Sequence, residues 1–129
     1  MTVAPPPTDA ERLTVTLPWP VRAAWPNGGH GHWAVVHRER KRQHALAYYK
    51  GLERPRGMFR GVERFRVTIT GHPTRPGRVD ADGLVSAVKG YLDGLALALR
   101  VDDSRFALSA SIAEPVPGGE VVVTVEALS

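Results

Sequence analysis

Polar and apolar residues alternate in two separate segments of the chain. One segment runs from Arg12 to Leu17 and stops at a Pro-Trp-Pro sequence, and the other runs from Phe65 to Thr70. A period of two is typical of a β-strand that buries one face. Two further strands are predicted at Arg105 to Glu114 and at Glu120 to Ala127, joined as a hairpin across the Pro- and Gly-rich residues between them.

Two helices are predicted between these strands. The first spans about Trp33 to Lys50 and ends at Gly51, and the second spans Gly83 to about Leu99. Apolar residues recur in the second at the i, i+4, i+7, i+8 and i+11 positions of an amphipathic helix, which two internal glycines weaken. These apolar residues are Leu84, Val88, Tyr91, Leu92 and Leu95, and the glycines are Gly90 and Gly94. The order β-α-β-α-β-β predicts an α+β domain with two main helices packed on a small mixed sheet.

The length and composition indicate one ordinary globular domain. A chain of 129 residues is long enough for one core and too short for two. We expect residues 12–129 to form this domain, after a flexible N-terminal arm at residues 1–11. The absence of cysteine excludes disulfides, thiolate nucleophiles and cysteine-ligated metal sites. No apolar run approaches roughly 18 residues and no signal peptide or nucleotide-binding glycine motif is present, so we expect a cytoplasmic protein without membrane or nucleotide partners.

Charge is unevenly distributed along the chain, which carries a formal net charge of +4. Ten Lys or Arg residues and three Glu residues lie between His37 and Arg66, whereas five of the remaining acids lie between Asp80 and Asp103. This segregation is typical of a protein that grips phosphates with one surface and holds a divalent metal with another. Two solvated surfaces of opposite charge are the alternative. The predicted DNA contacts are Arg38, Arg40, Lys41, Arg42, Lys50 and Arg78.

The most informative acids are Asp80 and Asp82, two residues apart just before the second predicted helix. Their carboxylates can point the same way if the backbone between them is extended, and they could then share one cation. Mg²⁺ prefers such oxygen ligands and keeps several waters. Bound Mg²⁺ polarises a phosphoryl oxygen and lowers the pKa of an attacking water, so phosphodiester hydrolysis is the natural reaction.

Helix geometry links these acids to a lysine. Asp82, Ser86, Lys89 and Asp93 fall at i, i+4, i+7 and i+11, which is one stripe of a helix. Lys89 could then reach towards a bound phosphate and support the charged transition state. The alternative interpretation is structural: Asp80 or Asp82 caps the helix, Lys89 is solvated, and the later acids form a turn.

Four short motifs add a more specific indication. They are Leu17-Pro18-Trp19-Pro20, Asp80-Ala81-Asp82-Gly83-Leu84, Leu92-Asp93-Gly94-Leu95 and Asp102-Asp103. In order and spacing they resemble the RusA family of Holliday junction resolvases, over about Leu13 to Glu126. In that family two aspartates of a D-x-D-N motif and the second aspartate of a later pair form the metal site. The resemblance therefore implies Asp80, Asp82 and Asp103 as catalytic ligands of Mg²⁺, for which Mn²⁺ could substitute.

The chain departs from the family pattern at two positions. Gly83 stands where the motif has asparagine, and Ser86 stands where the helix usually carries its assisting lysine. Lys89 lies one turn further along the same stripe and is predicted to take over that role. The resemblance further implies a RusA-like fold and a homodimer that makes paired nicks in four-way junctions during DNA recombination and repair, in bacteria or their phages. A two-fold dimer presents one acidic site to each of the two equivalent strands.

Two other functions stay open at this point. A non-catalytic protein could bind branched DNA with the same scaffold, if Gly83 and Ser86 have eroded the site. A single-strand binder could use the basic segment together with the aromatic residues Trp33, Tyr48 and Tyr49. The histidines His30, His32, His37 and His44 lack the spacing of known zinc sites, so a phosphate contact or a plain loop is favoured there.

Overall fold

The computed structural model describes residues 12–26, 33–77 and 79–128. The predicted N-terminal arm at residues 1–11 lies outside the described residues. The same holds for Arg78, a predicted DNA contact, and for His30 and His32.

A mixed four-stranded sheet forms one layer of the molecule. Its strands are β1 (Arg12–Pro18), β2 (Arg64–His72), β3 (Phe106–Ile112) and β4 (Glu120–Leu128). They lie in the order β1-β4-β2-β3; β4 runs antiparallel to β1 and β2, and β3 runs parallel to β2. The predicted α+β fold with a small mixed sheet is confirmed.

The predicted hairpin between the last two strands is wrong. β4 lies between β1 and β2, and β3 pairs with β2 on the side away from β4. The burial pattern explains the arrangement: β4 buries Val121, Val123 and Val125 and has partners on both sides, whereas most of β3 is exposed, as suits an edge. The residues between the two strands are numerous enough for the chain to cross β2 instead of turning back directly.

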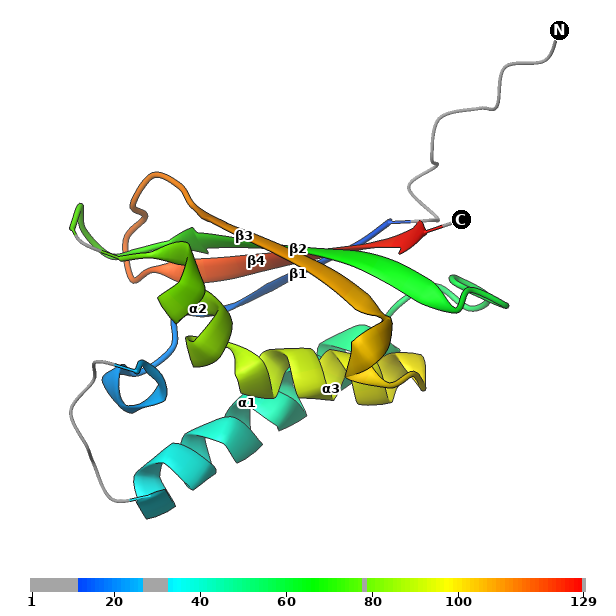
Figure 1. The fold of residues 1–129 in the computed structure, drawn as a ribbon, viewed down its shortest axis with the longest axis horizontal. Coiled ribbons are helices and arrows are strands. Elements are labelled where there is room, and N and C mark those ends of the chain that lie inside the picture. Colours follow the sequence, from blue (N-terminus) through cyan, green and yellow to red (C-terminus); the bar gives the residue numbers. More distant parts are fainter. Residues whose placement is uncertain (1–11, 27–32, 78, 129) are drawn as a thin grey trace, which may run out of the picture.

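Three helices cover one face of this sheet: α1 (Trp33–Leu52), α2 (Ala81–Ala87) and α3 (Lys89–Leu99) (Figure 1). Alternate strand residues such as Val15, Val67 and Ile69 form the core beneath them. The second predicted helix is therefore two helices, and the prediction of one continuous helix is wrong at Val88, whose φ of −102° and ψ of 14° interrupt the regular backbone. No helix in the described part of the chain is both long and apolar enough to cross a membrane.

Helices α1 and α3 approach each other closely. A Cβ atom at Gly94 would overlap the backbone carbonyl of His44, and one at Gly51 would lie 2.7 Å from the Cβ of Ala98. Gly51 was expected to end the first helix, but it lies inside α1 and is buried there. Gly94, which weakens the helical pattern, and Gly51 thus permit the close contact between α1 and α3.

Candidate functional site

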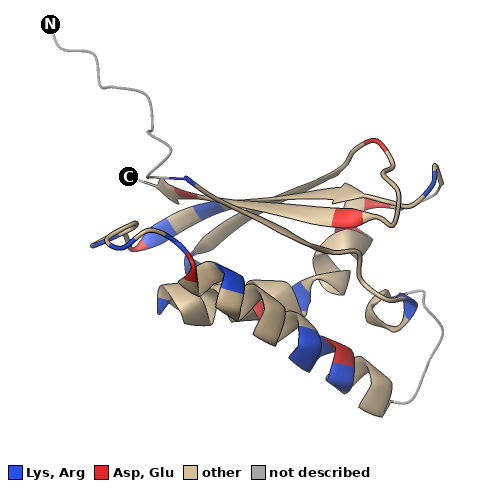
Figure 2. Ribbon diagram, turned by 180° about the vertical axis from the view of Figure 1, so that it is seen from behind, with Lys and Arg blue, Asp and Glu red and all other residues tan. Residues whose placement is uncertain are grey.

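Helix α1 carries five of the ten Lys and Arg residues of the basic segment, and the other five follow it in the chain (Figure 2). Four of its five predicted DNA contacts are exposed and have no ion-pair partner among the described residues: Arg38, Arg40, Lys41 and Lys50. The fifth, Arg42, binds the buried carboxylate of Glu39 through two hydrogen bonds of 2.6 and 2.8 Å. Burial raises the pKa of Glu39, but the hydrogen bonds and charge of Arg42, with smaller contributions from Val21 and Gln43, outweigh it and leave the pKa lowered. Arg42 is thus held in a structural ion pair.

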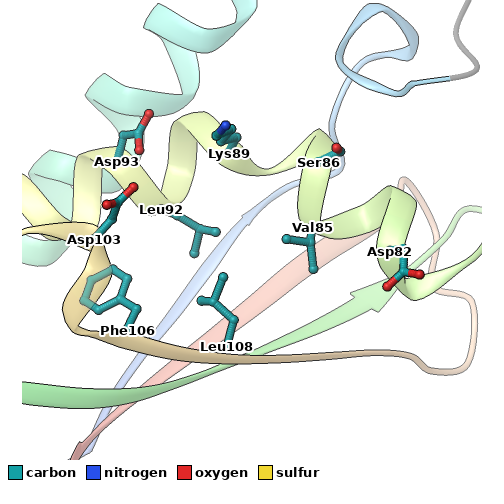
Figure 3. A pocket seen from close by; sticks show the side chains of 9 residues that line it. All are labelled: Asp82, Val85, Ser86, Lys89, Leu92, Asp93, Asp103, Phe106 and Leu108. Carbon is teal, nitrogen blue, oxygen red and sulfur yellow. The ribbon is translucent and has the colours of Figure 1, made fainter.

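A pocket of about 220 Å³ opens between α2, α3 and the start of β3 (Figure 3). Its polar lining consists of Asp82, Ser86, Lys89, Asp93 and Asp103, and its apolar lining of Val85, Leu92, Phe106 and Leu108. All four residues of the predicted helical stripe line this pocket. They do so although the helix is interrupted between the second and the third of them.

The acids lie towards different ends of the pocket. Figure 3 shows Asp93 and Asp103 at one end and Asp82 at the other, with Lys89 between them. At neutral pH, three carboxylates and one ammonium group give this lining a formal charge of −2. A DNA phosphate would be repelled there unless a cation neutralised part of that charge.

Asp80 has a different position from the one expected. It precedes α2 as its N-cap, where its side chain accepts a hydrogen bond from the backbone N–H of Gly83, and it is not among the residues that line the pocket. A Cβ atom at Gly83 would lie 2.9 Å from Oδ1 of Asp80. An asparagine at this position would therefore force the capping aspartate to shift, which gives a physical reason for glycine in this chain.

The adjacent acids Asp102 and Asp103 have separate roles. Oδ1 of Asp102 accepts a hydrogen bond of 2.9 Å from the backbone N–H of Ser104, which caps the short 3₁₀ helix η3 (Asp103–Arg105). This hydrogen bond is the main cause of the lowered pKa of Asp102. Asp103 lines the pocket. The motif comparison likewise selects the second aspartate of the pair.

The donor set agrees with Mg²⁺ in kind, because carboxylate oxygens around an open pocket are the ligands that this ion prefers. Two of the three predicted ligands, Asp82 and Asp103, line the pocket, and Asp93 adds a carboxylate that the sequence left unassigned. Within the described ranges, however, no three Asp, Glu or His side chains lie close enough together to hold one ion. The expected cluster of Asp80, Asp82 and Asp103 is not assembled as a ready ligand set.

The sequence interpretation missed the apolar half of the pocket. Phe106 and Leu108 belong to β3, and they reach the pocket because β3 pairs with β2 rather than with β4. The predicted hairpin concealed this placement. Their alternation along the strand was the available signal, but alternation does not identify which neighbour a strand faces.

Comparison with known proteins identifies a relative of this chain. No family model matches the chain. An uncharacterized protein of Xylella fastidiosa (strain Temecula1 / ATCC 700964) is 31% identical over 121 residues, which cover 90% of this chain and 77% of that protein. Such identity along most of both chains indicates a common fold, and this protein belongs to the same family as the Xylella fastidiosa protein.

Proposed function

We propose that the protein is a Mg²⁺-dependent endodeoxyribonuclease that resolves four-way DNA junctions by paired phosphodiester hydrolysis, in recombination and repair. The observation that carries this proposal is that three carboxylates and a lysine from α2, α3 and η3 line one pocket. The RusA-like order of the sequence motifs supports the choice of branched DNA as substrate.

In this proposal, Asp82 and Asp103 are the residues that would hold Mg²⁺, whose remaining ligands would be water and phosphate oxygens. Because the two side chains lie at different ends of the pocket, they would have to approach each other to share one ion. The bound ion would polarise a phosphoryl oxygen and acidify a water. Asp93 adds negative charge that favours cation binding. Asp80 stays a predicted ligand on the strength of the motif alone, because one of its oxygens already accepts the N–H of Gly83.

Lys89 supplies the positive charge of the pocket lining. A phosphodiester gains negative charge on its oxygens as a nucleophile attacks, so an ammonium group beside it lowers the barrier. The side chain is exposed and can adjust to the substrate. This role requires a positive charge rather than a particular hydrogen-bond geometry, and an arginine should replace the lysine in part.

DNA would be held by the exposed cations of α1. Arg38, Arg40 and Lys41 lie within one turn, and their only acidic neighbour on the helix, Glu39, is already paired with Arg42. Contacts of this kind bind the phosphate backbone without regard to sequence. They suit a protein that recognises the shape of a junction.

A homodimer follows from the same proposal, because two strands of a junction must be cut. The edge strand β3 and the exposed Leu97 on α3 offer a surface for it, and the Leu97 side chain is 53% exposed. Sheet edges and exposed apolar side chains are common in interfaces.

The aromatic residues of α1 favour a second candidate, a protein that binds single strands without cutting. Trp33 is 78% exposed and Tyr49 is 64% exposed, and exposed rings on a basic helix can stack on unpaired bases. This candidate gives no role to the acidic pocket.

One substrate panel separates these functions. The full chain is incubated with a four-way junction, a linear duplex and a single strand, with Mg²⁺ or with EDTA, and binding and cleavage are both measured. We expect paired nicks in the junction only, and only with Mg²⁺. Junction binding without cleavage in any divalent metal would support the non-catalytic function, and equal affinity for single strands would support the second candidate.

A further inference from the structure

The break between α2 and α3 is occupied by a side chain from another helix. Gln43 of α1 is 1% exposed, and its amide Nε2 donates a hydrogen bond of 2.8 Å to the carbonyl oxygen of Ala87. Its Oε1 accepts a hydrogen bond of 3.3 Å from the backbone N–H of Tyr91. One side-chain amide is therefore hydrogen-bonded to both the last residue of α2 and the third residue of α3.

Ala87 and Tyr91 are four residues apart. In a continuous α-helix, the N–H of Tyr91 would donate to the carbonyl of Ala87. Helical bonds flank the break, from Val88 to Leu84 at 3.0 Å and from Leu92 to Val88 at 3.1 Å. The side chain of Gln43 thus takes the place of a backbone hydrogen bond, and it keeps two buried polar groups satisfied while the helix changes direction.

The surroundings determine which way the amide points. Nε2 also lies 3.4 Å from Oε2 of Glu39, so that its two neighbours, a carboxylate and a carbonyl, are both acceptors. Oε1 faces a donor, the N–H of Tyr91. The hydroxyl of Tyr91 in turn donates to the carbonyl of Pro18 at 2.7 Å, which anchors the start of α3 to the end of β1. Only a side chain that carries a hydrogen-bond donor on one atom and an acceptor on the other can replace the amide.

The break separates the two halves of the candidate site. Asp82 and Ser86 belong to α2, and Lys89 and Asp93 belong to α3. We infer that Gln43 is a positioning residue: it holds the break and thereby sets Lys89 and Asp93 of α3 relative to Asp82 of α2. The catalytic consequence of this role rests on the proposed function, whereas its structural consequence does not.

The structural consequence is tested by NMR on the full chain, with hydrogen-bond scalar couplings measured in wild type and in Gln43→Leu. In wild type we expect a coupling between the Tyr91 amide and the side-chain carbonyl of Gln43. In Gln43→Leu, Tyr91 and Ala87 are left without their partner, and we expect a coupling between these two residues, with shifted amide signals from Lys89 to Asp93. Unchanged signals there would overturn the inference.

The catalytic consequence is tested by single-turnover cleavage of the junction. Gln43→Leu should lower the maximal rate about 100-fold, as expected when reacting groups are displaced by about 1 Å, and should leave junction affinity unchanged. Ala47→Gly is the matched control, because Ala47 is fully buried on α1 one turn further along and its side chain makes no hydrogen bond. The control should lose stability but keep the wild-type rate. Equal losses of rate in both variants would overturn the positioning role.

Gln43→Glu provides a rescue that does not depend on Gln43→Leu being folded. A protonated carboxyl has the shape of the amide, donates to Ala87 and accepts from Tyr91. Burial and the neighbouring carboxylate of Glu39 raise the pKa of the introduced carboxyl group, and the positive charge of Arg42 offsets part of this rise. The other titratable group nearby is the Tyr91 hydroxyl, whose own pKa is raised by burial. The rate relative to wild type, and the Lys89 to Asp93 signals, should return towards wild-type values as pH falls. A ratio of the Gln43→Glu rate to the wild-type rate that does not change with pH would contradict the inference. If wild type cuts no DNA, the proposed function fails, and the NMR signals alone decide the role of Gln43.

Discussion

Arg42 donates two hydrogen bonds to Glu39, from Nε at 2.6 Å and from Nη2 at 2.8 Å, on helix α1, which carries five Lys or Arg residues and one acid. The pair neutralises the single acid of α1, Glu39, which is 5% exposed. The cations beside it, Arg38, Arg40 and Lys41, are left uncompensated. A structural ion pair and exposed cations without such a partner are thus interleaved on one helix.

Glu39 should make stability depend on pH. Its folded pKa lies below the ordinary value of 4.5, so its contribution is fully present above pH 4.5 and is lost as pH falls through the folded pKa. At pH 7, Glu39→Gln should lower the free energy of unfolding by about 1–2 kcal/mol, because one charged hydrogen-bonding partner is lost. Urea unfolding between pH 7 and pH 3 measures the difference. The difference in the free energy of unfolding between wild type and Glu39→Gln should become smaller below pH 4.5. A difference that stays the same from pH 7 to pH 3 would contradict the assigned ion pair.

Two arginines on α1 should respond differently to substitution. Arg40→Gln should weaken DNA binding and reduce the slope of log affinity against log salt by about 1, because one phosphate contact is lost. Arg42→Gln should instead lower the melting temperature, since it leaves Glu39 buried without its partner. Fluorescence anisotropy at several salt concentrations, with thermal melts of both variants, makes the comparison. The same salt slope in wild type and Arg40→Gln would remove α1 from the DNA-binding surface.

The neighbouring aspartates Asp102 and Asp103 offer a matched pair. Asp103→Asn should reduce Mg²⁺-dependent cleavage by more than the roughly 10- to 100-fold typical of residues that only support a metal ligand. Asp102→Asn should cleave normally, because an amide oxygen can still accept the N–H of Ser104. Both residues are exposed, so neither change should alter the melting temperature by more than a few degrees. Comparable activity of the two variants would contradict the assignment of Asp103 to the site.

The close contact between α1 and α3 should tolerate no side chain at Gly94. Gly94→Ala places a methyl group against the His44 carbonyl and should destabilise the protein by about 1–3 kcal/mol or more. Gly77→Ala is the control, since a Cβ there meets nothing within 4 Å, and it should change stability by no more than about 0.5 kcal/mol. Equal melting temperatures would show that the helices can separate to accept the methyl group.

The sequence predicted those features that depend on local periodicity. Alternation identified β1 and β2, and the helical stripe brought Asp82 and Lys89 to one surface. Strand pairing could not be predicted in the same way, because the choice of β2 as the partner of β3 depends on the whole sheet. The break at Val88 depends on Gln43, 44 residues before Ala87.

The roles of adjacent acids were also beyond local reasoning. Asp80 and Asp82 are equally good capping residues, and so are Asp102 and Asp103. Only the packed structure assigns the cap to the first of each pair and the pocket to the second. Identical side-chain chemistry at neighbouring positions leaves no sequence signal to separate them.

The central claim is that the pocket at Asp82 cuts branched DNA with Mg²⁺. The most direct measurement is strand cleavage of an end-labelled four-way junction by wild type and by Asp82→Asn, with junction binding measured in parallel by gel shift. We predict paired nicks by wild type in Mg²⁺, and normal binding without cleavage by Asp82→Asn. Wild-type protein that binds the junction but leaves it intact in every divalent metal, or an Asp82→Asn variant that cuts as wild type does, would contradict the claim.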